Sequence, residues 1–217
     1  NAVGMAIAEE ILRKKFGPTL INNKTYVIAS DGDLMEGISH EAMSLAGHLK
    51  LKNLIVFFDN NKISIDGSTS LSVSDNYKKR FEGYGWNFLE INGHNEKQIS
   101  KAITKASKAN KPTLISCKTI IGFGSPNKSG KASSHGSPLG VEEIALVRKK
   151  LKWNNEPFKI PEDILNSWRT IGKKGIKLEE KWLETLNKKN SHIKSELNKT
   201  YVESNLNNLE DLIKKEK

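Results

Sequence analysis

Two oxygen-bearing side chains, Asp31 and Asn61, stand thirty positions apart, and each follows a short apolar run, 25–30 and 54–58. Such runs are typical of buried strands in a parallel sheet. If the two strands are neighbours, the carboxylate and the amide oxygen meet at one edge of the sheet. These oxygens suit a hard cation such as Mg²⁺, which takes water and phosphate oxygens as its other ligands. Gly32 lacks a Cβ where a diphosphate would approach the backbone. Asp-Gly and Asn-Asn are also ordinary turn residues, so spacing alone leaves a plain turn as an equal alternative.

The elements that would position these residues alternate between helix and strand. Helical patterns cover 2–16, 36–50, 76–84, 99–109 and 141–151, and apolar strand-like runs cover 25–30, 54–58, 86–91 and 113–121. The strands are apolar throughout instead of alternating with polar residues, which indicates burial on both faces. The sequence therefore predicts an α/β fold, with a doubly wound, mostly parallel sheet and helices on both faces.

A loop is predicted at 122–140, where nineteen residues hold five Gly, five Ser and two Pro. A loop of this length inside a compact domain is usually functional or disordered. Its segment 124–132 has some likeness to a phosphate-binding P-loop. Five residues separate its glycines instead of four, Ala132 replaces the metal-binding Ser or Thr, and no helix follows directly, so we reject that interpretation.

Beyond Pro161 the pattern is helical and polar, and we interpret it as a helical extension that leaves the sheet domain. Its expected anchors are apolar or aromatic: Trp168, Trp182, Leu186, Ile193 and Leu197. The predicted division is a domain at 1–152 and an extension at 153–217. Residues 1–6 have neither an initiator Met nor signal-peptide features and resemble the middle of a helix, so we expect a chain truncated there.

The formal net charge of +10 raises the hypothesis of a nucleic-acid-binding protein. Against it, the lysines are dispersed: from Gly172 onward, eleven Lys lie among eight acidic residues, which predicts a mixed-charge surface. An anionic small-molecule partner suits a basic protein equally well. The sequence contains no run of 18 apolar residues, so no membrane span is predicted. The single cysteine, Cys117, excludes an internal disulfide, fits a reducing cytosol, and is expected to be a buried structural thiol.

Several segments, taken in order, are similar to the thiamine-diphosphate-binding part of the transketolase family. They are Ser30-Asp-Gly-Asp-Leu-Met-Glu-Gly-Ile-Ser-His-Glu41, Ser44-Leu-Ala-Gly-His-Leu-Lys-Leu51, Asp59-Asn-Asn-Lys-Ile-Ser-Ile-Asp-Gly67, Phe81-Glu-Gly-Tyr-Gly-Trp86, Cys117-Lys-Thr-Ile-Ile-Gly-Phe-Gly-Ser-Pro-Asn-Lys128 and Ser134-His-Gly-Ser-Pro-Leu-Gly140. The resemblance extends from residue 1 to about residue 170 and is highly specific.

This resemblance implies site residues position by position. The metal ligands would be Asp31 and Asn61 through side-chain oxygens and Ile63 through its carbonyl. The cofactor contacts would be Gly32, Asn61, Ile65 and His135. The catalytic set would be His135, near the cofactor and the sugar, together with Glu36 and Glu41 of a subunit-interface carboxylate network. Without the resemblance, His135 would be taken for an exposed loop residue, and Glu36 and Glu41 for helix-face charges. Ser30 stands where the family usually has Gly; we expect the metal site to survive this change.

The resemblance also implies a function: transfer of a two-carbon ketol unit from a ketose phosphate to an aldose phosphate in the pentose phosphate pathway. The implied cofactors are thiamine diphosphate and Mg²⁺, with Ca²⁺ or Mn²⁺ as possible substitutes. The implied assembly is a cytoplasmic homodimer formed through a second domain absent from this sequence, so the segment alone should be inactive. The alternatives are the amino-terminal subunit of a split transketolase and a dihydroxyacetone synthase.

Overall fold

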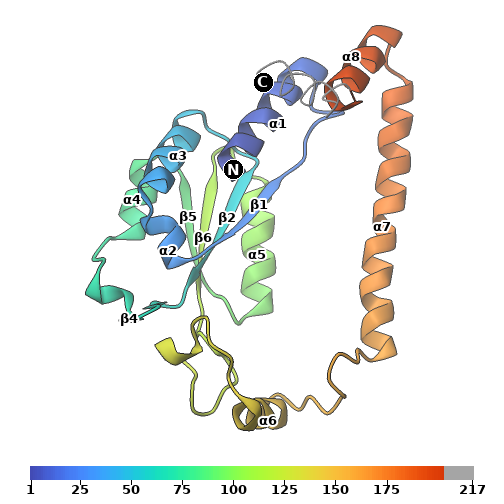
Figure 1. Ribbon diagram of the computed structural model, residues 1–217. Coiled ribbons are helices and arrows are strands. Elements are labelled where there is room, and N and C mark those ends of the chain that lie inside the picture. The colour runs from blue at the N-terminus through green and yellow to red at the C-terminus, as the bar shows by residue number, and fades with distance from the viewer. Residues whose placement is uncertain (203–217) are drawn as a thin grey trace, which may run out of the picture. The chain divides into compact units, whose positions relative to one another are not determined.

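The computed structural model describes residues 1–202, and its centre is a four-stranded parallel sheet (Figure 1). The strands lie in the order β1 (Thr25–Ala29), β2 (Leu54–Asn60), β6 (Thr113–Lys118) and β5 (Asn87–Asn92). All three neighbouring pairs are parallel. The predicted mostly parallel sheet is therefore confirmed, and all four carboxyl ends lie at one edge.

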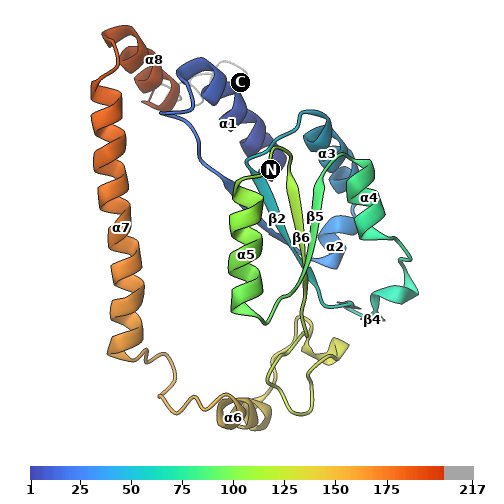
Figure 2. The ribbon, with the colours of Figure 1, turned by 180° about the vertical axis from the view of Figure 1, so that it is seen from behind.

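Helices precede, connect and follow these strands. In chain order they are α1 (Ala2–Phe16), α2 (Asp31–Met35), α3 (Gly37–His48), α4 (Tyr77–Gly83), α5 (Glu96–Ser107) and α6 (Val141–Lys150). Helices α3 and α4 lie on one side of the sheet and α5 on the other, as the two opposite views show (Figures 1 and 2). The α/β prediction with helices on both faces is confirmed.

The strand β2 shows how the sheet separates two hydrophobic clusters. Val56 and Phe58 belong to the cluster formed with α1, α3 and α4, whereas Ile55 and Phe57 face the smaller cluster formed with α5. Successive side chains of a strand point to opposite faces, so an apolar run is required where both faces are covered. This burial is the physical reason for the unbroken apolar pattern of the sequence.

Three short elements at the carboxyl edge are not among the predicted ones. Helix α2 begins directly after β1, and β3 (Ile63–Ser64) pairs with β4 (Gly67–Ser68) in a small hairpin. The strand β6 ends at Lys118 instead of at residue 121, because both neighbouring strands end opposite Lys118, at Asn60 and Asn92. Short 3-10 helices cover Thr69–Leu71 and Ala132–Ser134.

The chain divides into two compact units, one of residues 1–10 and 23–156 and the other of residues 11–22 and 157 onward. The second unit contains α7 (Glu162–Asn187) and α8 (Ser191–Val202). Its apolar cluster includes four of the expected anchors: Trp182, Leu186, Ile193 and Leu197. The fifth expectation is wrong, since Trp168 is 72% exposed. The apolar contacts of this unit fall on the second half of α7, and Trp168 lies in the first half.

Across residues 1–202, no helix combines the length and the apolar character that a membrane span requires.

Candidate functional site

The carboxyl ends of β1 and β2 bring the two oxygen-bearing segments to the same edge of the sheet. The two strands are parallel neighbours, with Ala29 opposite Phe58 at their ends. Asp31 follows the first strand and Asn61 follows the second. Ligands of open α/β sheets bind at such carboxyl ends, so this edge is the first place to look for a site.

Ser30 fixes how the chain turns from β1 into α2. Its backbone N–H and its hydroxyl both donate to Asp33 Oδ2, at 2.7 and 2.8 Å, and its Oγ accepts from the Asp33 N–H at 3.4 Å. This reciprocal arrangement is a capping box, which holds the start of a helix. Ser30 therefore supports the local backbone, and Asp31 becomes the first residue of α2.

Asp31 is a buried carboxylate that lacks a hydrogen-bond partner. Its side chain belongs to a residue only 3% exposed, and neither carboxylate oxygen accepts a hydrogen bond. Burial raises the pKa of this carboxyl above its usual range; the ammonium group of Lys62 opposes the rise and the carboxylate of Asp59 adds to it. The Tyr77 hydroxyl and the Lys62 N–H also lower the pKa slightly, although neither makes a hydrogen bond of normal geometry with Asp31. Buried charges are normally paired or bound to a metal. The burial of Asp31 without a hydrogen-bond partner makes it a candidate ligand for a cation.

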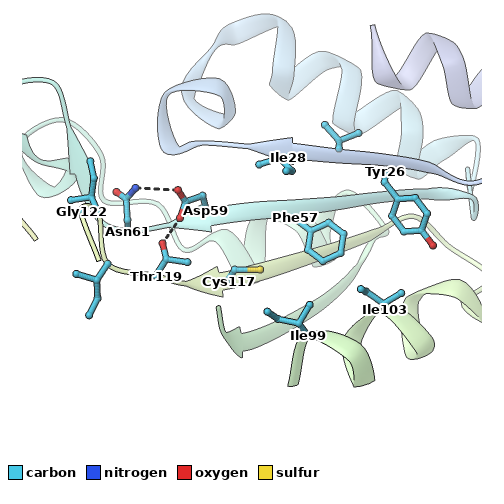
Figure 3. A pocket seen from close by; sticks show the side chains of 13 residues that line it. Tyr26, Ile28, Phe57, Asp59, Asn61, Ile99, Ile103, Cys117, Thr119 and Gly122 are labelled. Atoms are coloured by element: carbon cyan, nitrogen blue, oxygen red, sulfur yellow. Dashed lines mark hydrogen bonds between the residues drawn. The ribbon is translucent and has the colours of Figure 1, made fainter. Parts of the chain in front are cut away.

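The Asn61 side chain is held in place by its neighbours in sequence. Its Oδ1 accepts from the Ile63 N–H at 2.9 Å, and its Nδ2 donates to Asp59 Oδ2 at 3.3 Å. Asp59 in turn accepts from the Thr119 hydroxyl, so the ends of β2 and β6 are tied together (Figure 3). Between Asn61 and Ile63, Lys62 has a φ of +66°, a left-handed conformation that is uncommon outside glycine. The backbone is thus strained at this edge.

An apolar pocket of about 890 Å³ runs from this edge along the α5 face of the sheet (Figure 3). Asp59, Asn61 and Thr119 line its polar end, and the remainder is almost entirely apolar. The apolar lining includes Tyr26, Ile28, Phe57, Ile99, Ile103 and Cys117. Burial raises the pKa of the Cys117 thiol to about 11, with a smaller contribution from the charge of Asp59. Cys117 is buried and almost entirely in the weakly reactive thiol form at neutral pH, in agreement with the structural role predicted for it.

The other candidate residues lie at the surface and make no described contact with Asp31. Gly32 is exposed, and a Cβ built on it would have only Ser30 Oγ within 4 Å, so the space above it is open. Ile65, in the turn between β3 and β4, is 71% exposed. Glu36 precedes α3 and makes no side-chain cap, and Glu41 is exposed on that helix. His135 is also exposed, directly after the 3-10 helix at Ala132–Ser134.

Arg80 is a residue that the sequence gives no reason to single out. Its guanidinium donates to the Leu34 carbonyl of α2 at 3.0 Å and to Asp75 at 2.8 Å, and it lies 3.3 Å from His40 Nε2. His40 is half-buried and also lies 3.0 Å from the Tyr84 hydroxyl. Contacts between residues forty or more positions apart leave no local pattern, so sequence reasoning does not find them.

The donor set at this edge consists of one unpartnered carboxylate together with amide and carbonyl oxygens. Within residues 1–202, no three His, Cys, Asp or Glu side chains gather into a metal-binding group. Oxygen donors of this kind suit Mg²⁺ or Ca²⁺ rather than Zn²⁺ or a softer metal. A metal ion here would complete its coordination with oxygens of a bound ligand or of water.

Fold and candidate site together define a parallel α/β domain with oxygen donors at the carboxyl ends of its first two strands. The sequence model of the family "transketolase, thiamine diphosphate binding domain" matches residues 1–206, and the chain belongs to that family. A transketolase of Buchnera aphidicola is 54% identical over 189 residues, which are 85% of this chain and 28% of the relative. The chain thus spans less than a third of the length of this relative.

Solved structures agree with this assignment. A transketolase from Campylobacter jejuni superimposes with a TM-score of 0.88 at 40% identity, covering 92% of this chain and 31% of that one. A Pichia stipitis transketolase in complex with xylulose-5-phosphate gives a TM-score of 0.87 at 37% identity, with the same coverage. The fold seen here is therefore that of the corresponding part of transketolases.

Proposed function

We propose that this chain supplies the diphosphate- and metal-binding domain of a transketolase, which moves a two-carbon ketol unit from a ketose phosphate to an aldose phosphate. The observation that carries the proposal is the buried, unpartnered carboxylate of Asp31 at the end of β1. Family membership and relatives named as transketolases support ketol transfer over dihydroxyacetone synthesis. A solved relative in complex with xylulose-5-phosphate supports sugar phosphates as substrates.

The metal in this proposal is Mg²⁺, with Ca²⁺ or Mn²⁺ as substitutes. Asp31 contributes a carboxylate oxygen, Asn61 its amide oxygen and Ile63 its backbone carbonyl. The Asn61 side chain is already oriented by the Ile63 N–H and by Asp59, so little rotational freedom is lost when the cation binds. A divalent cation would offset the burial of Asp31, which no hydrogen bond offsets now.

Thiamine diphosphate is the cofactor of the proposal, and when bound it supplies the carbanion-stabilising chemistry. Gly32 leaves open space in which a diphosphate approaches the backbone. Asn61 contacts the same diphosphate, and the exposed side chain of Ile65 offers an apolar contact. The protein's part in this is to anchor and orient the charged end of the cofactor.

In this proposal, His135 contacts both the sugar substrate and the cofactor. Its imidazole is exposed in the long loop that follows β6, where it is free to donate a hydrogen bond to a substrate oxygen. Glu36, directly before α3, and Glu41, within α3, both have exposed carboxylates, which suits the carboxylate network of a homodimer. The lone, buried cysteine agrees with the cytoplasmic location proposed for the enzyme.

The test is the replacement Asp31→Asn in a full-length transketolase that carries this segment. Enzyme stripped with a chelator should regain ketol transfer when Mg²⁺ and thiamine diphosphate are added, and the variant should not, because a neutral amide is a far weaker Mg²⁺ ligand. Asp66→Asn, which changes an exposed aspartate after β3, is the matched control and should regain activity normally. Normal cofactor retention by the Asp31 variant would refute the metal assignment.

A further inference from the structure

The loop that carries His135 is closed by one buried carboxylate, that of Glu143. Glu143 lies in the first turn of α6 and is 7% exposed. Its Oε1 accepts from the Ser125 hydroxyl and from the Asn127 N–H, the latter at 2.8 Å, and its Oε2 accepts from Asn127 Nδ2 at 2.9 Å. Three donors from the start of the loop thus converge on one side chain at its end.

The hydrogen bonds continue from Glu143 through the loop to the residue beside His135. Ser125 Oγ, which donates to Glu143, accepts from the Lys128 N–H at 3.1 Å. The Lys128 carbonyl accepts from the Ser134 hydroxyl at 2.5 Å. Ser134 immediately precedes His135, whose own N–H donates to the Ala132 carbonyl at 2.8 Å. An unbroken series of bonds therefore connects the Glu143 carboxylate to the backbone of His135.

Close packing holds the same loop against the end of β6. A Cβ on Gly122 would lie 2.7 Å from Ser134 Oγ, so the Ser134 side chain packs directly against the Gly122 backbone. The Gly130 N–H donates to the Ile121 carbonyl at 2.8 Å, which folds the middle of the loop back on its start. The glycine- and serine-rich composition, which resembles a mobile linker in sequence, here builds a fixed loop.

We propose that Glu143 is a positioning residue: it holds the loop at 122–140 in the conformation that presents His135 to the sugar substrate. The inference rests on the proposed function, since it assigns His135 to the substrate. Hydrogen bonds lower the pKa of Glu143 to about 2, the largest effect coming from Ser125, so the carboxylate stays charged at neutral pH. Hydrogen bonds to a charged acceptor are stronger than neutral ones, which suits a single side chain that anchors a long loop.

The experiment compares Glu143→Ala with Glu142→Ala in a full-length transketolase that carries this segment. Glu142 is the exposed neighbour in the same helical turn, so it controls for the loss of a helix-terminal charge. We expect Glu143→Ala to lower kcat by about 10²-fold, as misplacement of a catalytic group typically does. The dissociation constants of Mg²⁺ and thiamine diphosphate should change less than twofold, because their ligands lie elsewhere. Glu142→Ala should leave all three quantities unchanged.

A double-variant comparison separates positioning from general damage. If Glu143 acts through His135, adding Glu143→Ala to His135→Ala should lower kcat no further than about twofold. Two independent losses that multiply would overturn the proposal. Glu143→Gln keeps one acceptor oxygen and should give an intermediate kcat, and it serves as the test if the alanine variant does not fold.

Hydrogen exchange over residues 122–140, followed by mass spectrometry, gives a measure that is independent of turnover. Exchange should accelerate in Glu143→Ala and stay unchanged in Glu142→Ala. Unchanged exchange in both variants would refute the positioning role of Glu143, even if the enzyme is an active transketolase. Absence of ketol transfer in the unmodified enzyme would instead refute the proposed function. The exchange result would then still show whether Glu143 holds the loop.

Discussion

At the scale of single residues, the unpartnered charge of Asp31 makes the stability of the metal-free chain depend on pH. Burial raises the pKa of this carboxyl, so the folded chain holds its proton to higher pH than the unfolded chain does. Ionisation therefore disfavours folding, and the stability contributed at low pH is lost as the pH rises above the usual value near 3.8. The metal-free protein carries this loss at neutral pH.

The corresponding prediction concerns Asp31→Asn in the 217-residue chain. In a chelating buffer, the variant should melt at the same temperature as the wild type near pH 4 and at a higher temperature near pH 7, because it has no carboxyl group to ionise. Thermal melting at several pH values between 4 and 7 measures the difference. Parallel melting curves for the two proteins across this range would contradict the assigned pKa shift.

His135 should matter for turnover and not for stability. Its side chain is exposed and no contact with the core is described for it, so His135→Ala should leave the melting temperature unchanged. Loss of a donor to a reacting oxygen typically lowers the rate by about 10² to 10³-fold. Steady-state kinetics and melting of the same full-length preparation test both statements. A large fall in melting temperature with normal turnover per folded molecule would show that the histidine is structural.

At the scale of elements, one glycine governs how closely α3 approaches the turn after α4. A Cβ on Gly47 would lie 1.7 Å from the Tyr84 carbonyl oxygen, a distance at which atoms overlap. Trp86, which follows that turn, donates from its indole to the Met43 carbonyl at 2.8 Å and closes the same contact. Helix, turn and strand are therefore fitted together at a point where no side chain has room.

Replacing this glycine should be far more harmful than replacing another helical glycine. Gly47→Ala should lower the free energy of unfolding by more than about 3 kcal/mol, since the backbone must move apart. Gly4→Ala in α1, where nothing lies within 4 Å of the new Cβ, should raise it by about 0.5 to 1 kcal/mol through helix propensity. Urea denaturation of both variants measures this contrast. Equal effects would show that the α3 contact is not tight.

Local patterns explain why the main elements could be predicted from the sequence and the edge elements could not. The apolar run at residues 54–58 predicts that β2 is buried on both faces, as it is. The helix α2 depends instead on the Ser30–Asp33 capping box, and Asp31-Gly32 in its first turn is also a common turn sequence. The hydrogen bonds of Arg80 and of Glu143 join residues that are distant in sequence, so they become visible only in the folded chain.

At the scale of the whole molecule, large apolar side chains are exposed on several elements of the described residues. Ile28 is 84% exposed beside the apolar pocket on the α5 face, and Ile38 is 71% exposed on α3. Parallel sheets are normally covered on both faces, and large apolar patches drive association. The exposed apolar side chains beside the pocket and on α3 are therefore expected to favour association.

We expect the isolated chain to associate, to bind thiamine diphosphate weakly at best, and to show no ketol transfer. Sedimentation velocity and calorimetry test this directly. Ile28→Lys should reduce association, whereas Val141→Lys, at an equally exposed apolar residue of α6, should not. A monodisperse monomer that binds the cofactor with micromolar affinity would contradict this expectation, and measurable turnover would refute it.

The position of Cys117 makes the pocket open to chemical labelling. It is the single thiol of the sequence, and it lines the pocket between Phe57 and the isoleucines of α5. A small maleimide should therefore alkylate one site only, slowly at neutral pH and faster toward pH 9 as the thiolate fraction grows. If self-association covers the α5 face, concentrated chain should be protected from alkylation and Ile28→Lys should not be. Mass spectrometry of the alkylated protein then reports which face of the sheet the neighbouring molecule occupies.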